Sequence, residues 1–516
     1  MTVVTCVIVG VDIDQRGIIM TVLEYLQEQN LKIRADCGGN GTCGKCLVEI
    51  VDEGGYRSLH KACKITYKEG MDIRVVDKPE DMTILSLNNT SVKEKGSSAG
   101  CGYERQKTAK YGVAIDIGTT TIAGVMTEIN NGEENKTVCD TAVINSGRLY
   151  GNDVISRIRA AGEGKNAEIT ALLRKDISAV ISKLIMKSGI NEISVVSIAA
   201  NPTMVHFLMG FDVSGLGAYP YRTVDIDMIT TALGMITEGL GFIGDIQVYI
   251  MPAVSAFVGG DILSGLFYCG AYYEKENTLF IDLGTNGEMA LYNKEDILTA
   301  STAAGPVFEG SSISCGTGGT DGAVYYFDVD KNGNFRYKTI NNLPPTGICG
   351  TGVIEITAAL LKKGLITPEG NMENDFRVAR RSNGSYIELT QEDIRQVQLA
   401  KAAIRTGVDL LIKKRALSYQ DIKRVYLAGG FGYNIDVKKA AVIGMLPAEL
   451  TERTEAPGNT SLLGAIKFIR GDIEKNIYEL EQIRSRCDHI DLAMEDEFQE
   501  TYINEINFRH CTEITT

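Results

Sequence analysis

Four cysteines near the start of the chain have the types and spacing of metal ligands. Cys37, Cys43 and Cys46 are followed by Cys63, which gives the spacing C-x5-C-x2-C-x16-C. The segment between Cys37 and Cys46 is rich in glycine, which lets a backbone wrap closely around a cluster and aim its N–H groups at sulfur. These residues predict four thiolates on one iron–sulfur cluster. A zinc site is the alternative, although zinc sites usually open with a short Cys-x2-4-Cys pair.

Two glycine–threonine turns later in the chain each follow an apolar strand. They are Asp116-Ile-Gly-Thr-Thr-Thr121 and Asp282-Leu-Gly-Thr-Asn286. Each strand delivers a carboxylate, and each glycine turns the backbone so that N–H groups and hydroxyls can face phosphate oxygens. We expect Asp116 and Asp282 to act in catalysis by holding Mg²⁺ through water, because this ion prefers carboxylate and phosphate oxygens. For either turn alone, a tight β-hairpin is the alternative.

A third glycine-rich stretch, Ala428-Gly-Gly-Phe-Gly432, offers a flat backbone surface on which an adenosine could lie. Together the three motifs predict a split nucleotide-phosphate cradle. The residues expected to bind the nucleotide are Gly118, Thr119, Thr120, Gly284, Thr285, Asn286, Gly429, Gly430 and Gly432. The loop at 347–352 opens a helix and could present N–H groups to an anion. A packing turn is its alternative, and we expect Cys349 there to be structural.

The elements that must position the three motifs form an internal duplication. The first copy has strands before Gly118 and at 121–129 and 138–144, helices between 153 and 188, and a buried strand at 193–199. The second copy has strands at 278–282, 287–292 and 297–302, helices at 352–363 and 397–415, and a strand from 425. Apolar strands without alternation indicate central strands that are buried on both faces. Two such βββαβα units could pack around a central cleft.

Composition and charge limit the function classes. The chain has 516 residues, a net charge of −14 and twelve cysteines. The acidic balance argues against nucleic-acid binding. No uninterrupted apolar run reaches the length of a membrane span, and the N-terminus has no basic region typical of a signal peptide. We therefore expect a cytoplasmic protein without a membrane partner. The cysteines outside the cluster are scattered, which is not typical of a disulfide framework.

The N-terminal module resembles plant-type and adrenodoxin-type [2Fe–2S] ferredoxins. Strands at 3–9, 46–51 and 72–76 and a helix at 21–28 suit a small α+β module, and Gly41-Thr-Cys-Gly-Lys-Cys46 is its closest match. The first gap of five residues differs from the plant-type gap of four, and the gap to Cys63 is shorter than in either branch. The resemblance implies a β-grasp domain in which Cys37, Cys43, Cys46 and Cys63 hold the cluster as a low-potential one-electron relay.

The rest of the chain resembles the superfamily of acetate kinase, sugar kinases, heat-shock chaperone ATPases and actin, which implies two lobes that close on ATP. The whole chain is similar to the reductive activators of corrinoid proteins, and the stretches at 201–207 and 251–259 support this. The resemblance implies an ATP-dependent transfer of one electron to a corrinoid protein of a methyltransferase system, which returns inactive Co(II) to Co(I). The partners implied are that corrinoid protein and a low-potential electron donor. The sequence does not decide whether the chain forms a homodimer.

These motifs predict a multidomain α+β and α/β chain. We expect a ferredoxin-like domain at 1–78, a polar flexible linker at 79–110, actin-like lobes at 111–275 and 276–470, and a C-terminal extension at 471–516.

Two other functions are weighed against corrinoid activation. One is an activator of a dehydratase or radical enzyme, which would place a four-iron cluster between two ATPase subunits. The cysteines of the core offer no matching pair. The other is a small-molecule kinase with a redox domain, for which no catalytic base or substrate pocket is evident. His206 lies in an apolar run, and we expect it to be a core residue and not a cobalt ligand.

Overall fold

The structure is a computed structural model. It describes residues 20–29, 31, 33, 35, 38–39, 46–51, 57–68, 70–75, 110–129, 136–240, 246–330, 333–429 and 435–508. The strand expected at 3–9 and the expected linker, apart from its last residue Lys110, lie outside the described residues. So do four residues predicted to bind cofactors: Cys37, Cys43, Gly430 and Gly432.

The N-terminal module contains one helix and a three-stranded antiparallel sheet. Its elements are α1 (Val22–Glu28), β1 (Leu47–Val51), β2 (Arg57–Lys61) and β3 (Asp72–Val75), with sheet order β2-β1-β3. α1 begins at Thr21 with a capping box, in which the Thr21 hydroxyl accepts from the Glu24 N–H and the Glu24 carboxylate accepts from the Thr21 N–H. The predicted helix and the two predicted strands that are described are confirmed.

The first lobe is built on a six-stranded mixed sheet in the order β6-β5-β4-β7-β9-β8. Its strands are β4 (Lys110–Ile117), β5 (Thr121–Ile129), β6 (Thr137–Ile144), β7 (Val195–Ala200), β8 (Ile229–Ala232) and β9 (Gln247–Ile250). Its helices are α2 (Val154–Ala160), α3 (Asn166–Ser188), α4 (Pro202–Met209) and α5 (Gly260–Tyr268). β4 pairs in parallel with β7 and antiparallel with β5. The turn at Gly118 therefore ends a central strand.

The second lobe repeats this arrangement in the order β19-β18-β10-β11-β12-β20. Its strands are β10 (Thr278–Leu283), β11 (Gly287–Tyr292), β12 (Ile297–Thr302), β18 (Arg424–Ala428), β19 (Thr454–Gly458) and β20 (Cys487–Ile490). Its helices are α7 (Gln391–Lys414), α8 (Val437–Val442), α9 (Thr460–Arg470), α10 (Ile473–Ser485) and α11 (Phe498–Asn504). β10, β11 and β12 form the same meander as β4, β5 and β6, and β10 pairs in parallel with β18. The predicted duplication is confirmed.

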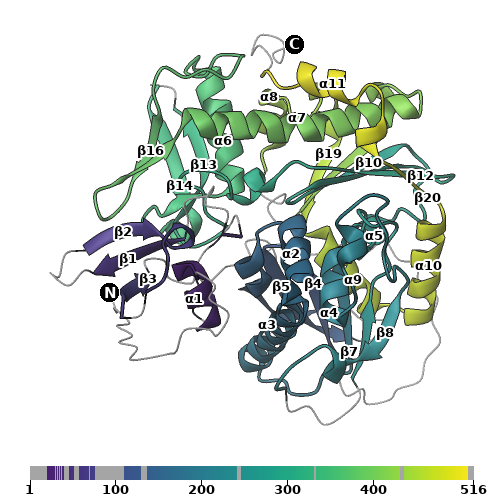
Figure 1. Cartoon of the computed structure of the whole chain (residues 1–516). Coiled ribbons are helices and arrows are strands. Elements are labelled where there is room, and N and C mark those ends of the chain that lie inside the picture. The colour runs from purple at the N-terminus through teal and green to yellow at the C-terminus, as the bar shows by residue number, and fades with distance from the viewer. Residues whose placement is uncertain are drawn as a thin grey trace.

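A group of small sheets is inserted between β12 and α7. Its elements are β13 (Ala323–Val329), β14 (Phe335–Thr339), β15 (Gly347–Ile348), α6 (Gly350–Lys362), β16 (Phe376–Arg380) and β17 (Tyr386–Leu389). In Figure 1, β13, β14 and β16 lie at the upper left, above the purple N-terminal module and away from the central sheets. The sequence predicted only α6 of this group.

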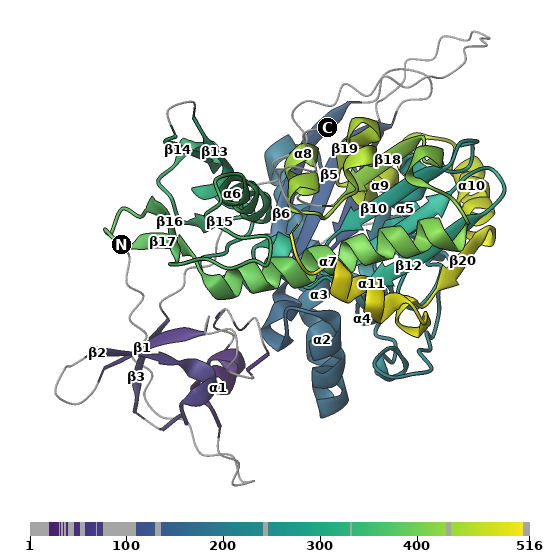
Figure 2. The same cartoon turned by 90° about the horizontal axis from the view of Figure 1, so that it is seen from above.

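Two helices, α5 and α9, pack together between the central sheets (Figure 2). α9 lies late in the chain but packs on β4 and β7 of the first sheet, where the Ser197 hydroxyl donates to the Ala465 carbonyl at 2.8 Å. A Cβ at Gly464 would lie 2.0 Å from the Ser264 carbonyl oxygen, so this close crossing requires glycine. The apolar cluster around the pair contains residues of both lobes. Among the described residues, no helix is long and apolar enough to cross a membrane.

Candidate nucleotide and iron–sulfur sites

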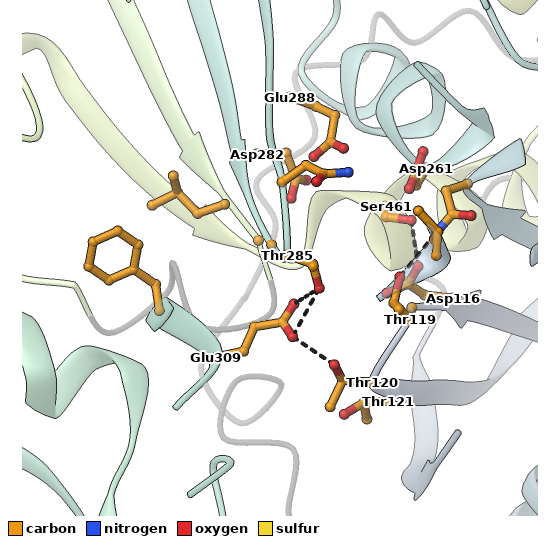
Figure 3. A pocket seen from close by; sticks show the side chains of 18 of the residues that line it. Asp116, Thr119, Thr120, Thr121, Asp261, Asp282, Thr285, Glu288, Glu309 and Ser461 are labelled. Atoms are coloured by element: carbon orange, nitrogen blue, oxygen red, sulfur yellow. Dashed lines mark hydrogen bonds between the residues drawn. The ribbon is translucent and has the colours of Figure 1, made fainter. Parts of the chain in front are cut away.

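The two glycine–threonine turns lie on opposite walls of one cavity between the lobes. The cavity has a volume of about 280 Å³. Gly118 N–H donates to the Thr121 carbonyl and Gly284 N–H donates to the Asn286 carbonyl, both at 2.9 Å, so each turn is tight. The predicted residues that the structure brings to this cavity are Asp116, Gly118, Thr119, Thr120, Asp282, Gly284, Thr285, Asn286 and Gly429. Figure 3 shows the side chains from both turns directed toward the space between them.

The third glycine motif reaches the cavity because β18 runs parallel to β10. In this register Ala428 lies opposite Asp282. Gly429 follows with a φ of 119°, and a Cβ there would lie 2.2 Å from the Leu283 carbonyl oxygen. This left-handed backbone and the close approach to Leu283 both require glycine. The motif therefore packs directly against the second glycine–threonine turn.

Five carboxyl groups line the cavity, three more than the sequence predicted. Asp116 accepts hydrogen bonds from Asn459 Nδ2 at 2.7 Å and from Ser461 Oγ at 2.8 Å. Burial raises the pKa of Asp116, although these two hydrogen bonds lower it. Burial also raises the pKa of Asp282 well above its usual range, and the charges of Asp261 and Asp116 raise it further. A divalent cation would relieve this mutual repulsion.

The carboxylates that the sequence analysis missed are Asp261, Glu288 and Glu309. Burial raises the pKa of Asp261 to about 7, and it raises the pKa of Glu288 well above its ordinary value. Asp261 follows the predicted stretch at 251–259 by two residues, and Glu288 is the second residue of β11. The positions of these two residues beside motifs that the sequence analysis recognised could have indicated that they line the cavity. Glu309 comes directly before the glycine-rich loop at 310–319, which was a weaker signal, because its contact with Thr120 depends on the approach of the two lobes.

Two buried polar residues hold the first glycine–threonine turn in place. Arg157 donates from Nη2 to the Thr119 carbonyl at 2.5 Å and from Nε to the Gly151 carbonyl at 2.8 Å. Burial lowers the pKa of its guanidinium to about 10, opposed by the nearby carboxylates of Asp153 and Glu309. Asn145 Nδ2 donates to the Gly118 carbonyl at 2.9 Å. Arg157 and Asn145 therefore fix the turn through the Thr119 and Gly118 carbonyls, while Thr119 and Thr120 line the cavity.

The loop at 347–352 needs glycine for packing and also lines the cavity. A Cβ at Gly350 would lie 1.6 Å from the Phe308 carbonyl oxygen, and one at Gly352 would lie 2.1 Å from that of Val324. Cys349, Gly350 and Thr351 reach the cavity wall. The Cys349 thiol is buried 3.3 Å from the Val324 carbonyl oxygen, and burial raises its pKa to about 11. This thiol is structural, as the sequence indicated.

In the N-terminal module, two of the four predicted metal ligands are described and lie side by side. Cys46 Sγ and Cys63 Sγ are 3.3 Å apart, and both side chains are buried. The Ala62 N–H donates to the Cys46 carbonyl at 2.7 Å, which holds the two segments together. Gly38 and Gly39, which follow Cys37, have φ values of 59° and 92°. Two adjacent buried thiols and left-handed glycines fit a metal cluster held by thiolates.

His206 is a core residue, as predicted. Its side chain is fully buried, with Nδ1 at 2.7 Å from the Pro202 carbonyl and Nε2 accepting from the Val224 N–H at 2.9 Å. Burial lowers the pKa of the imidazole. Both ring nitrogens are therefore engaged by the backbone.

The fold and the cavity define a two-lobed ATPase of the actin-like class joined to an iron–sulfur module. Three family matches follow the same division. Residues 19–72 match the 2Fe-2S iron-sulfur cluster binding domain, residues 111–274 match the RACo middle region, and residues 276–515 match the C-terminal domain of RACo, the ASKHA domain. The chain belongs to the family of reductive activators of corrinoid proteins.

Relatives with names of this kind match most of the chain. The "Corrinoid activation enzyme RamQ" of Eubacterium limosum is 29% identical, with 96% of each chain covered. The "[Co(II) methylated amine-specific corrinoid protein] reductase" of Methanosarcina barkeri is 26% identical, with 77% of each covered. A solved structure titled "Reductive activator for corrinoid,iron-sulfur protein" has a TM-score of 0.71 and 26% identity, and the match covers 97% of both chains.

Proposed function

We propose that this protein uses ATP to drive one electron from a [2Fe–2S] cluster to a corrinoid protein, which returns inactive Co(II) to Co(I). The observation that carries this proposal is that one chain holds a thiolate site and a nucleotide cradle. The relatives named for corrinoid activation and for reduction of a Co(II) corrinoid protein match over most of their length, which supports the same task here.

The cluster would be held by Cys37, Cys43, Cys46 and Cys63. The short distance between the Cys46 and Cys63 sulfurs supports this set, as does the glycine-rich segment that precedes Cys46. A bound [2Fe–2S] cluster supplies one electron at a time at a low potential, about −400 mV in plant-type ferredoxins. An external donor of still lower potential would reduce it.

The nucleotide would lie between the lobes, with its phosphates on the two glycine–threonine turns. The hydroxyls of Thr119, Thr120 and Thr285 would donate to phosphate oxygens, and the stretch from Gly429 to Gly432 would carry the adenosine. Asp116 and Asp282 would hold Mg²⁺ through water. Their raised pKa values support a cation there, because a positive charge would offset the repulsion between the carboxylates.

Coupling to ATP is needed because the cobalt couple of this family lies below a typical [2Fe–2S] potential. Each 100 mV of gap costs about 2.3 kcal/mol per electron. Closure of the two lobes on the nucleotide could change the conformation or the cobalt ligation of the bound partner and so make the transfer favourable. The polar segment 79–110 would let the cluster module reach first the donor and then the cobalt.

The test is the rate of Co(I) formation, followed by its visible absorbance, with a candidate corrinoid protein and a chemical low-potential reductant. We expect rapid Co(I) formation only with Mg·ATP. Equal rates of Co(I) formation with and without ATP would contradict the proposed coupling of electron transfer to ATP. Phosphoryl transfer from ATP to a metabolite would favour the kinase alternative instead.

A further inference from the structure

One carboxylate, that of Glu309, joins the two phosphate turns across the cavity. Thr120 Oγ1 donates to Glu309 Oε2 at 2.7 Å, and Thr285 Oγ1 lies 3.3 Å from both carboxylate oxygens. Figure 3 shows Glu309 between these two threonines. Thr120 belongs to the first lobe and Thr285 to the second. The carboxylate therefore occupies the place where hydroxyls from both lobes converge.

The backbone holds Glu309 firmly in this position. It ends the short 3₁₀ helix η6 (Pro306–Glu309), in which Phe308 is buried. The next residue, Gly310, has a φ of 76°, and a Cβ there would lie 1.9 Å from the Thr317 carbonyl oxygen. The chain after Glu309 is thus packed tightly against Thr317.

Glu309 is partly buried and is not neutralised by a direct ion pair among the described residues. Among the described residues, Glu309 accepts from the two threonine hydroxyls and from the Thr285 backbone, and no lysine or arginine forms a salt bridge with it. Burial raises its pKa, while the hydroxyls of Thr120 and Thr285 and the more distant charge of Arg157 lower it. A carboxylate that is held by neutral donors, with no cation in direct contact, keeps its capacity to accept a proton.

A bound phosphate would take the same hydroxyls. Because phosphate and carboxylate are both negative, they cannot share these two donors favourably. Entry of a nucleotide would therefore release the carboxylate from Thr120 and Thr285 and leave it beside the terminal phosphate. This step rests on the proposed function, in which ATP is the ligand of the cavity.

We propose that Glu309 is the general base of ATP hydrolysis in this protein. Its carboxylate accepts a proton from a water molecule as the water oxygen bonds to the terminal phosphorus. The bond from that phosphorus to the bridging oxygen breaks, and its electron pair leaves with ADP. The proton then passes from Glu309 to the released phosphate or to solvent, so no other reactant is consumed.

The other carboxylates of the cavity are less suited to this role. Asp116 is engaged by Asn459 and Ser461. Asp261 accepts from the Ile262 N–H at the start of α5, at 2.9 Å. In Figure 3, Asp282 and Glu288 lie together on the far side of Thr285 from Thr120. Glu309 alone among the five contacts a hydroxyl from each phosphate turn.

The first test compares nucleotide binding with hydrolysis in a Glu309→Gln variant of the full chain. Glutamine keeps the size and can accept from the threonines, but it cannot take the proton. We expect the Kd of a non-hydrolysable ATP analogue to stay within about threefold, or to fall. The single-turnover rate of ATP hydrolysis should fall by about 10²–10⁴-fold, the usual contribution of a general base. Hydrolysis within tenfold of the wild-type rate would overturn the proposal.

The second test uses chemical rescue of Glu309→Ala. Added formate should restore part of the hydrolysis rate, whereas formamide, which has a similar shape but no basic oxygen of this kind, should not. Equal rescue by both would assign Glu309 a packing role and contradict the proposal. Failure of the wild-type chain to bind ATP would instead refute the proposed function, so the two failures are distinguishable.

Discussion

At the scale of single residues, the chemistry depends on carboxyl groups that crowd one cavity and on two thiols that lie in contact. In the nucleotide cavity, burial raises the pKa of Asp116, Asp282 and Glu288. In the N-terminal module, two buried thiols lie in contact without forming a disulfide. Charged carboxylates this close together are costly without a positively charged partner, and adjacent thiols can serve together as ligands of a metal. We interpret the crowded carboxyl groups as ligands for Mg²⁺ and the paired thiols as ligands for iron.

A change at Cys63 tests the proposed cluster ligand whose spacing from the other cysteines departs most from the ferredoxin pattern. A Cys63→Ser variant should lose most of its bound iron and the visible absorbance of the cluster, because a hydroxyl replaces one of four thiolates. Iron and sulfide analysis of the purified chain measures this. Cys139→Ser is the matched control and should keep two irons per chain, since Cys139 lies in β6 of the first lobe. Full iron content in Cys63→Ser would mean that another group supplies the fourth ligand.

Asp261 should make stability depend on pH. Its pKa is about 7 in the folded chain, above the usual value of 3.8, so the folded state binds the proton more tightly than the unfolded state. The free energy of unfolding should therefore fall as pH rises from about 4 to about 7. An Asp261→Asn variant should lose less stability over this window, by on the order of 1 kcal/mol.

Urea unfolding at pH 5 and pH 8, without nucleotide or Mg²⁺, measures this difference. Glu295→Gln, which alters an exposed carboxylate, should keep the wild-type pH dependence. If Asp261→Asn followed the wild-type curve at both pH values, Asp261 would not hold its proton in the folded state.

At the scale of elements, the crossing of α5 and α9 joins the lobes. Gly464 of α9 meets the Ser264 carbonyl of α5, and the Ser264 hydroxyl donates to the Ser461 carbonyl at 2.8 Å. Ser461 also donates to Asp116 in the cavity. A change in the spacing of these helices would therefore displace Ser461 and alter its hydrogen bond to Asp116 in the cavity.

A Gly464→Ala variant tests this crossing. The added Cβ would lie 2.0 Å from the Ser264 carbonyl oxygen, so the helices must move apart. We expect a loss of about 1–3 kcal/mol in the free energy of unfolding, typical of overpacking. Gly162→Ala is the control, because no atom lies within 4 Å of its added Cβ. Denaturant unfolding compares the two, and equal stability would show that the crossing is not tightly constrained.

Local patterns predicted most of the elements but not their long-range packing. The three strands of each meander were predicted within one residue or a few, because apolar runs and glycine turns mark their ends. α7 begins at Gln391, six residues before the predicted start, because the capping box of Thr390 and Asp393 begins the helix in a polar segment. The packing of α9 on the first sheet and the contact between Glu309 and Thr120 join segments far apart in the chain, and the sequence has no local signal for either.

At the scale of the whole molecule, the chain combines a module with one paired-thiol site and two lobes with one shared cavity. Neither site alone defines the function, since the thiols alone are typical of an electron relay and the cavity alone is typical of many ATPases. Their presence on one chain supports a mechanism in which nucleotide turnover controls the transfer of a single electron.

The most direct test is a single-turnover experiment on the full chain. The cluster is reduced, the excess reductant is removed, and a Co(II) corrinoid protein is added before Mg·ATP. Our account predicts that the cluster stays reduced until ATP arrives, and that one Co(I) then forms for each cluster that is reoxidised. Co(I) formation at the same rate without ATP, or ATP hydrolysis that leaves the cluster reduced and the cobalt as Co(II), would contradict it.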